Sequence, residues 1–251
     1  MSNHYIEFQN VSKAFGENQV LKEISFFVDA GETLAIMGRS GAGKSVTLGH
    51  IMGFLKPDAG RVWVAGEDIT DYSESELEHI RKKVTMVFQS GALFDSLPIF
   101  ENVAFPLREQ RDWTEQHIEE IVLGLLDLLE IRELGDSLPS QLSTGMKRAA
   151  AIARALAAQP EAVLYDEPTT MVDPLMSQHI GELIKKLKYQ LKLTSVVVTH
   201  DTALARKVAD RVMFLEGGNG IFFGTVQELS VCSDSFIQEF LQQDEVRPLS
   251  R

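Results

Sequence analysis

The chain has 251 residues, 44% of them hydrophobic, and a formal net charge of −12. This length allows one large α/β domain or a core with a small inserted lobe, and the acidic balance speaks against a nucleic-acid partner. No run approaches about 18 consecutive apolar residues, so we expect no transmembrane helix, and the N-terminus has no signal-peptide pattern. Cys232 is the single cysteine, which excludes an intrachain disulfide and fits a reducing cytosol.

The N-terminal part of the chain predicts β-strands followed by a helix. Aromatic and β-branched residues partly alternate over 5–8 and 24–28, and a turn at 15–18 separates these two strands. A third strand is expected over Glu32–Met37 and a helix over Val46–Met52.

The motif G-x-x-x-x-G-K-S lies between this third strand and this helix, as a phosphate-binding loop requires. Its glycines let backbone N–H groups close round phosphate oxygens, and the helix N-terminus adds the positive end of a dipole. Lys44 can reach the β- and γ-phosphates, and the Ser45 hydroxyl can ligate Mg²⁺. The residues predicted to bind the nucleotide here are Gly38, Arg39, Ser40, Gly41, Ala42, Gly43, Lys44, Ser45 and Val46.

Residues 56–88 predict a turn, a strand over 61–65, a helix to about Lys83 and another strand. The helix is expected to begin at Ser73, because Ser73 and Glu76 have the spacing of a capping box.

Residues 89–157 change character, and we interpret them as a helical lobe inserted into the α/β core. Pro98 and Pro106 are expected to break the first part of this segment. Apolar residues at helical spacing predict a helix over Thr114–Glu130, and another helix is expected over about 144–158.

Val-rich strands alternate with helices in the rest of the chain, which indicates a mainly parallel sheet. The expected strands are 162–165, 195–198 and 211–215, and the expected helices are about 174–191 and 202–208.

A last amphipathic helix is expected over Asp234–Gln242, where apolar residues gather on one side. It fits a helix docked on its own domain or a contact between subunits.

Two carboxylates, Asp166 and Glu167, end the strand over 162–165. An acid in this place holds Mg²⁺ in phosphate-loop folds, and a second acid beside it can polarise a water molecule for in-line attack. The pair strengthens the prediction of a nucleotide site.

Four further segments resemble motifs of the ATP-binding-cassette (ABC) ATPases. Residues 141–148, with the A-R-A-L run that follows, are similar to the signature motif, usually written L-S-G-G-Q. Residues 166–174 resemble the Walker B and D-loop run, 198–201 the H-loop and Phe88–Gln89 the Q-loop. With the phosphate loop, these motifs follow the family's order and cover about residues 5–225.

The resemblance implies an α/β P-loop NTPase with a mainly parallel sheet, an N-terminal antiparallel β subdomain and an inserted α-helical subdomain. Residues 1–88 and 158–230 would form the ATP-binding core, 89–157 the helical subdomain, and 231–251 a C-terminal helix and tail. The implied activity is hydrolysis of ATP to ADP and phosphate, with Mg²⁺, coupled to transmembrane transport.

The resemblance also implies a role for each motif residue. Glu167 would be the general base or water positioner, and Asp166 would hold Mg²⁺ through water. Ser45 and Gln89 would also contact the metal, and Gln89 would sense the transporter interface. His200 would contact the γ-phosphate.

The signature residues Ser143, Thr144, Gly145 and Met146 would face the γ-phosphate bound by the opposite subunit, which makes the ATP site composite and a homodimer obligatory. The residues agree with this role, since Ser143 can cap a helix whose dipole then points toward an anion. Asp173 would connect the two sites across the dimer.

Three positions depart from the family's pattern or leave alternatives open. Phe15 occupies the usual place of the aromatic that stacks on adenine, but it also fits a core or turn aromatic. Thr144 replaces the first signature glycine, and Ala149 stands where many members have arginine. Both departures bear on the turnover rate more than on the existence of the site.

Residues 88–97 and 100–109 closely resemble one subgroup, the ATPases of Mce-type phospholipid transporters such as the Mla system of Gram-negative bacteria. Met146, in place of the signature glutamine, is a known variation among such lipid-handling relatives. In these systems the ATPase homodimer is peripheral to the cytoplasmic face of the inner membrane, under two integral-membrane permeases. It carries a small STAS-domain regulator and works with an Mce-domain substrate-binding protein, so the resemblance implies phospholipid transport across the cell envelope.

Other interpretations stay open. The segment over 89–109, with aromatics expected to be exposed at Phe94, Phe100 and Phe105, also fits the coupling surface of an importer for amino acids or another small solute. An ABC ATPase acting on nucleic acid or ribosomes would need a long coiled-coil insertion, tandem cassettes or a basic face, and the sequence shows none of these. A nucleotide-dependent clamp with little hydrolysis is a third alternative, although Lys44 and the acidic pair speak against it.

Overall fold

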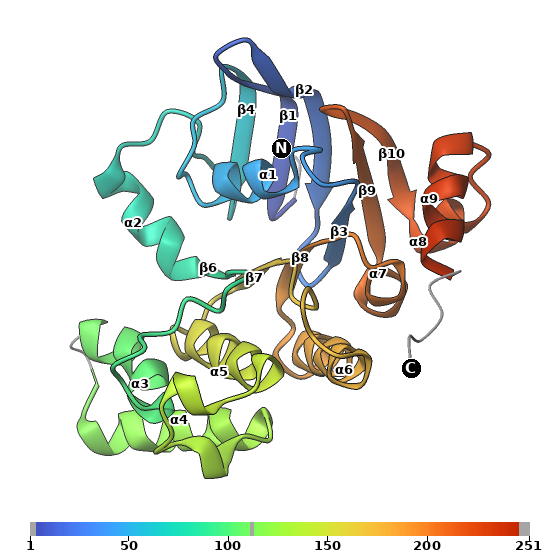
Figure 1. The fold of residues 1–251 in the computed structure, drawn as a ribbon. Helices are drawn as coiled ribbons and strands as arrows, with labels where there is room; N and C mark the ends of the chain where they lie inside the picture. The colour runs from blue at the N-terminus through green and yellow to red at the C-terminus, as the bar shows by residue number, and fades with distance from the viewer. Residues whose placement is uncertain (1–3, 111–112, 246–251) are drawn as a thin grey trace.

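The structure is a computed structural model that describes residues 4–110 and 113–245 (Figure 1). Two sheets lie together in the upper part of Figure 1, and a lobe of helices lies below them. Residues 246–251, the end of the C-terminal helix and tail predicted over 231–251, lie outside the described residues.

The first sheet is antiparallel, with four strands in the order β2-β1-β4-β5. Its strands are β1 (Ile6–Phe15), β2 (Asn18–Val28), β4 (Ala59–Val64) and β5 (Glu67–Asp68). β1 and β2 pair from Ile6↔Val28 to Phe15↔Asn18, around the predicted turn. The predicted antiparallel subdomain is therefore confirmed, while the short strand β5 was not predicted.

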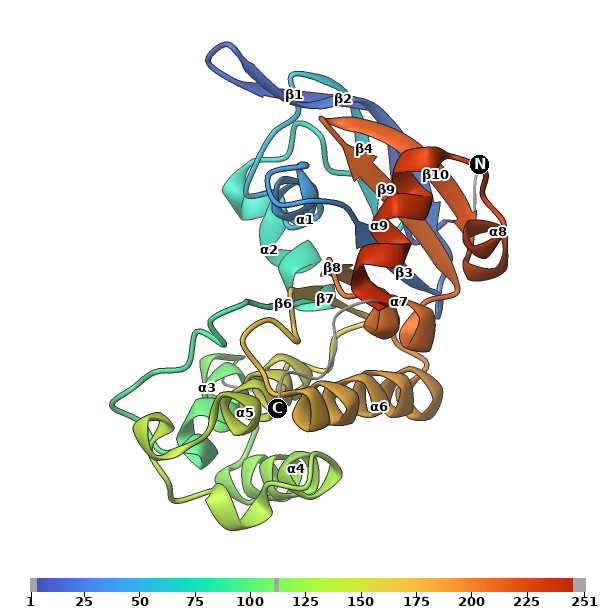
Figure 2. The same ribbon diagram turned by 45° about the vertical axis from the view of Figure 1, so that its right-hand side comes forward.

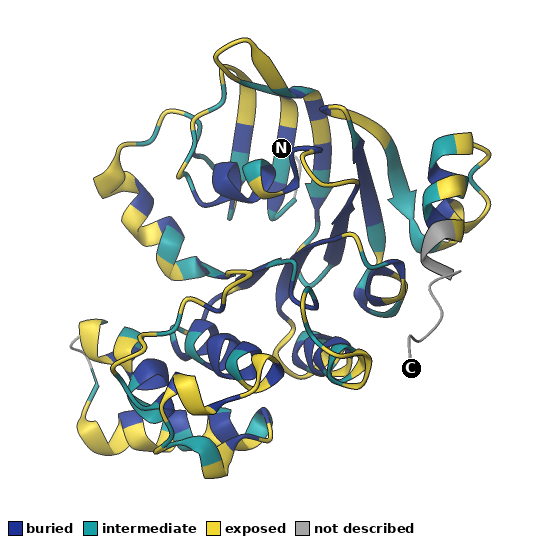
Figure 3. Ribbon diagram, in the orientation of Figure 1, coloured by how far each residue is buried: buried dark blue, intermediate teal, exposed yellow. Residues whose placement is uncertain are grey.

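The second sheet has six strands in the order β10-β9-β3-β8-β7-β6. They are β3 (Thr33–Met37), β6 (Val84–Val87), β7 (Ala162–Asp166), β8 (Thr194–Thr199), β9 (Arg211–Glu216) and β10 (Asn219–Thr225). All neighbours pair in parallel except β9 and β10, which form an antiparallel hairpin. Every residue of β3 and β8 is buried, as expected for a sheet covered on both faces (Figure 3).

Alternate residues along the central strands face two different cores. Leu164 and Val196 pack with the first sheet and the helix after the phosphate loop, whereas Val163 and Tyr165 pack with the helical lobe. A hydrogen bond of 2.8 Å from the Lys22 amide to the Gly218 carbonyl joins the two sheets. The end of β3, where the phosphate loop begins, is thus fixed between two packed layers.

The helices include those predicted and some that were missed. They are α1 (Lys44–Ile51), α2 (Glu74–Lys83), α3 (Ile99–Gln110), α4 (Glu115–Leu128), α5 (Thr144–Ala157), α6 (Pro174–Leu191), α7 (Thr202–Val208), α8 (Val226–Ser230) and α9 (Ser235–Glu245), with 3-10 turns at Arg132–Leu134 and Pro139–Gln141. The capping box at α2 is present, since the Ser73 amide donates to Glu76 Oε2 at 2.8 Å. Among the described residues, no helix combines the length and the hydrophobicity needed to cross a membrane.

Helices α3, α4 and α5 lie between β6 and β7 in the chain and pack together beside α6 (Figure 1). The expectation that Pro106 breaks this segment is wrong, because Pro106 lies inside α3. Pro98 instead stands just before that helix. The buried face of α3, which includes Val103 and Leu107, holds the helix together by packing despite the missing proline N–H. Phe100, expected to be exposed, is partly buried against the core of the lobe.

The C-terminal helix α9 docks on its own chain, beside β9 and β10 (Figure 2). Ile237 and Leu241 are buried, and Phe236 and Phe240 meet the Phe214 ring edge-on at centroid distances of 6.2 and 4.9 Å. The structure therefore agrees with the interpretation that this helix docks on its own domain.

Candidate functional site

The phosphate loop joins β3 to α1 in a conformation that only glycine adopts easily. Gly38 has a φ of 147°, and a Cβ there would lie 2.2 Å from the Leu215 carbonyl oxygen. Gly43 has a φ of 101°, and a Cβ there would lie 2.9 Å from the Val20 carbonyl oxygen. These glycines let the loop curl tightly against β9 and β2, with α1 beginning directly after it.

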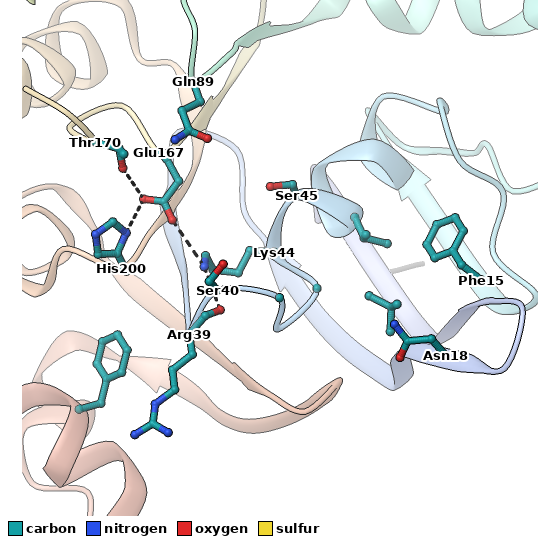
Figure 4. A pocket seen from close by; sticks show the side chains of 15 residues that line it. Phe15, Asn18, Arg39, Ser40, Lys44, Ser45, Gln89, Glu167, Thr170 and His200 are labelled. Carbon is teal, nitrogen blue, oxygen red and sulfur yellow. Dashed lines mark hydrogen bonds and ion pairs between the residues drawn. The ribbon is translucent and has the colours of Figure 1, made fainter.

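An open pocket of about 980 Å³ lies over this loop (Figure 4). It brings together most of the predicted residues: Phe15, Arg39, Ser40, Gly41, Gly43, Lys44, Ser45, Val46, Gln89, Glu167 and His200. Figure 4 shows Phe15 and Asn18 at one end of the pocket and Glu167 with His200 at the other. Phe15 is 48% exposed there, so a flat ring is available to a ligand at the far end from the acids.

Lys44 is the buried cation of the pocket. Its Nζ donates to the carbonyl oxygens of Gly38 at 3.0 Å and Arg39 at 3.2 Å. It also lies 3.5 Å from Glu167 Oε1. A phosphate entering the loop would meet an ammonium group already held in place by the backbone.

Glu167 follows β7 with a φ of 47°, which turns its side chain into the pocket. Its Oε2 lies 2.8 Å from His200 Nδ1 and accepts a hydrogen bond from Thr170 Oγ1 at 3.1 Å. Burial raises the pKa of this carboxyl, but the His200 hydrogen bond and the charges of His200 and Lys44 outweigh burial, so the pKa lies below its ordinary value. Glu167 is therefore ionised at neutral pH and able to accept a proton.

Asp166, the last residue of β7, receives a hydrogen bond of 3.1 Å from Ser45 Oγ at the start of α1. Burial, followed by repulsion from Glu167, raises the pKa of the Asp166 carboxyl. A hydroxyl and a crowded carboxylate are hard oxygen donors whose charge a divalent cation would relieve. The residues therefore fit Mg²⁺, with Gln89 close by on the pocket wall and nucleotide phosphates supplying further oxygens.

The signature residues lie outside this pocket. Ser143 caps α5 by accepting a hydrogen bond from the Met146 amide at 3.3 Å. A Cβ at Gly145 would lie 2.1 Å from Met176 Cγ, so the helix start is packed against α6. Asp173 caps α6 in the same way, accepting from the Met176 amide at 3.0 Å. The residues that line the chain's own nucleotide pocket therefore do not include Ser143, Thr144, Gly145 or Met146.

Sequence reasoning missed several residues of the site. Asn18, Val20 and Phe240 line the pocket, and Thr170 binds the Glu167 carboxylate. Thr170 stands three residues after Glu167, a spacing that allows contact across a tight turn. Phe240 comes from α9, and nothing local in the sequence brings that helix to the phosphate loop.

A glycine-rich loop between a parallel strand and a helix, a buried lysine and a paired strand-end acid define a P-loop nucleotide hydrolase. A sequence profile of the ABC transporter family matches residues 21–170. The chain belongs to this family, and it is the ATP-hydrolysing subunit of an ABC transporter.

Known proteins resemble almost the whole chain. It is 38% identical over 99% of its length, and 94% of the relative's, to the intermembrane phospholipid transport system ATP-binding protein MlaF of Haemophilus influenzae. It is 35% identical to the methionine import ATP-binding protein MetN of Clostridium tetani, covering 97% of this chain and 76% of that one. The dimeric structure of a post-hydrolysis state of the ATP-binding cassette MJ0796, bound to ADP and Pi, superposes with a TM-score of 0.81 at 34% identity, over 88% of this chain and 98% of that one.

Proposed function

We propose that this chain energises phospholipid transport across the cell envelope, as the ATPase of a transporter of the Mla or Mce type. The observation that carries the proposal is the likeness to MlaF over 99% of the chain. The Met146 variant of the signature and the segment over 88–109 support it. The likeness to a methionine importer supports the alternative, import of an amino acid or another small solute.

In the proposed mechanism, Glu167 orients a water molecule against the γ-phosphate and accepts its proton. The Lys44 ammonium binds the β- and γ-phosphates, and His200 holds the Glu167 carboxylate in place and contacts the γ-phosphate. Asp166, Ser45 and Gln89 would hold Mg²⁺, which supplies charge neutralisation at the phosphates when bound.

The composite site is proposed to form between two copies of the chain. Ser143 and the start of α5 would face the γ-phosphate in the partner's pocket, and Asp173 would lie between the two sites. Met171 and Leu175 flank Asp173 and are 89% and 78% exposed, an apolar surface that fits burial in such a dimer. The cassette MJ0796, which the chain resembles, is dimeric.

The permease contact is proposed to involve Phe94 and Phe105. Their rings lie 4.7 Å apart and are 41% and 39% exposed. Asn102 is buried and fixes this surface, since its side chain accepts from the Phe94 amide at 2.7 Å and donates to the Phe94 carbonyl at 3.1 Å. Two fixed, exposed rings fit the apolar end of a helix from a membrane subunit.

The proposed assembly is a homodimer under two integral-membrane permeases, peripheral to the cytoplasmic face of the bacterial inner membrane. A STAS-domain regulator and an Mce-domain substrate-binding protein complete it, and no nucleic acid takes part. This assembly rests on the likeness to MlaF.

The first test compares ATP hydrolysis by the purified chain and by Glu167→Gln, each with and without its co-expressed permease. We expect hydrolysis to fall by roughly 10²–10⁴-fold, the usual contribution of a general base, while ATP binding persists and traps a dimer. Glu182→Gln, on an exposed α6 acid paired with Lys207, is the matched control. Equal, negligible rates in wild type and Glu167→Gln despite tight ATP binding would favour the nucleotide clamp.

The second test identifies the substrate class. The chain and its permease are reconstituted in vesicles with a fluorescent phospholipid and, separately, with radiolabelled methionine. ATP-dependent movement of the lipid alone supports the proposal. Movement of methionine alone replaces it with the importer.

A further inference from the structure

Arg148 is a buried cation that the mechanism above does not use. It lies on α5, five residues after the cap Ser143, and is only 3% exposed. Its Nη1 donates to the Phe88 carbonyl at 2.7 Å, but its Nε is buried and finds no acceptor among the described residues. A buried guanidinium with incomplete hydrogen bonding is costly to keep, which points to a use beyond stability.

The Phe88 carbonyl accepts two hydrogen bonds at the turn that contains Gln89. The Gly91 amide donates to the same carbonyl at 2.9 Å, so Gln89 and Ser90 are the central residues of a tight turn. Gly91 and Ala92 then follow with φ values of 81° and 48°. In Figure 4 the Gln89 side chain projects from this turn toward Glu167.

A second arginine of α5 holds the far side of the same loop. Arg154 donates to the Ala92 carbonyl at 2.7 Å and to the Gly91 carbonyl at 3.2 Å. Of the two, only Arg148 binds the carbonyl directly before Gln89. Burial lowers the pKa of Arg148, and the charge of Asp166 raises it. The Arg148 cation therefore lies close enough to interact electrostatically with the acid predicted to hold Mg²⁺.

We infer that Arg148 is a positioning residue for Gln89, tying the turn of the Q-loop to the helix that carries the signature motif. The guanidinium fixes the Phe88 carbonyl and thereby the direction in which Gln89 enters the pocket. The inference rests on the proposed role of Gln89 in hydrolysis.

The test is a double-mutant cycle between Arg148→Met and Gln89→Ala, in the full chain, measured as kcat and KM for ATP. Methionine keeps much of the volume and removes the donor and the charge. We expect Arg148→Met to lower kcat about tenfold, as loss of one hydrogen bond to a charged group implies, with KM for ATP changed less than about twofold. In the Gln89→Ala variant, adding Arg148→Met should lower kcat only slightly further.

Two further variants separate positioning from folding. Arg148→Lys keeps a charged donor on the same helix and should recover part of kcat. Lys185→Met removes a positive charge from an exposed position on α6, away from the signature motif and the pocket lining, and should leave kcat unchanged. Thermal unfolding of each variant reports whether the fold persists.

The outcomes distinguish a wrong positioning role for Arg148 from a wrong role for Gln89. Suppose that Gln89→Ala lowers kcat, and that Arg148→Met lowers kcat by the same factor in the Gln89→Ala variant as in the wild type. The positioning role is then wrong, while the proposed function stands. The same conclusion follows if Arg148→Met lowers kcat and KM rises in parallel with a loss of thermal stability that Arg148→Lys does not repair. If Gln89→Ala leaves kcat unchanged, the proposed role of Gln89 fails and the inference fails with it.

Discussion

The Arg39 guanidinium lies 4.7 Å from the centre of the Phe236 ring, so a phosphate-loop side chain rests on the C-terminal helix. Glu239 of the same helix lies 3.8 Å from Arg39 Nη2, an exposed pair that adds little by itself. Phe240, one turn on, lines the nucleotide pocket. Helix α9 therefore contacts the phosphate loop through Phe236 and lines part of the nucleotide pocket through Phe240.

Phe236→Ala is expected to weaken ATP binding roughly two- to fivefold, because loss of a cation–π contact of this kind leaves Arg39 less ordered at the pocket rim. Titration with a fluorescent ATP analogue measures the change. Phe54→Ala is the matched control, since the Phe54 ring carries Arg81 at 5.0 Å on another surface. Unchanged affinity in Phe236→Ala would show that α9 packs beside the pocket without supporting it.

The pH dependence of hydrolysis is expected to change when His200 is replaced. Burial raises the pKa of Glu167, and His200 is the strongest of the groups that lower it below 4.5. In His200→Asn the strongest lowering cause is lost, so the pKa of Glu167 should rise and the acid limb of kcat/KM should move to higher pH in a profile over about pH 4 to 8. His200 is also predicted to contact the γ-phosphate, so the position of the limb, and not the rate alone, is the measurement.

Thr170→Val should shift the same limb in the same direction but less, because the Thr170 hydrogen bond is a weaker cause of the lowered Glu167 pKa. Thr169→Val is the control, since Thr169 binds Asp201 and not Glu167. A profile that stays in place in His200→Asn would mean that His200 does not set the protonation of Glu167.

Local sequence patterns predicted the parts of the site whose geometry is set by neighbouring residues. The phosphate loop depends on glycines within one short segment, and Gly38 and Gly43 have the positive φ values that such a loop needs. Ser143 caps α5, as its residue type and position predicted. Asp173 caps α6 in the same way, although that cap was not predicted. The buried run of β3 likewise identified a strand of a covered parallel sheet.

Tertiary contacts decided what the sequence could not predict. Pro106 is a helix breaker by its own chemistry, but the packed face of α3 outweighs that preference. Arg148 is buried and reaches the Phe88 carbonyl, whereas Lys147 beside it is partly exposed. Phe240 reaches the pocket through the docking of α9 on Phe214 of β9, a contact between two separate elements. Such residues are found only when distant segments are placed together.

Asp166→Asn is expected to raise the melting temperature of the nucleotide-free chain at neutral pH. The pKa of Asp166 is raised above 3.8, first by burial and then by Glu167, so the folded state binds this proton more tightly than the unfolded state does. The ionised carboxylate therefore costs stability above its folded pKa, and the cost disappears as pH falls below 3.8. Each kcal/mol relieved should appear as roughly 2–4 °C in thermal unfolding.

Glu67→Gln provides the control of opposite sign. The pKa of Glu67 is lowered, first by the His79 hydrogen bond, so this carboxylate favours the folded state above 4.5 and its loss should not raise the melting temperature. Asp166→Asn should also lose most of the extra stability that ATP with Mg²⁺ gives the wild type. A lower melting temperature in nucleotide-free Asp166→Asn would contradict a site that sacrifices stability for metal binding.

Phe94→Glu separates hydrolysis from transport. Phe94 packs on Phe105 and on the Arg154 guanidinium, 5.7 Å from its ring centre, and it lines no part of the nucleotide pocket. A carboxylate in place of this exposed ring should repel an apolar helix end of the permease while leaving the phosphate loop unchanged. Basal ATPase of the isolated chain is therefore expected to persist, and ATP-driven transport in vesicles with the permease is expected to fall at least tenfold, as for loss of a hot-spot aromatic. Tyr189→Glu, at a 68% exposed ring on α6, controls for a new surface charge. Loss of ATP binding in Phe94→Glu would place the effect inside the nucleotide site and remove Phe94 from the proposed permease contact.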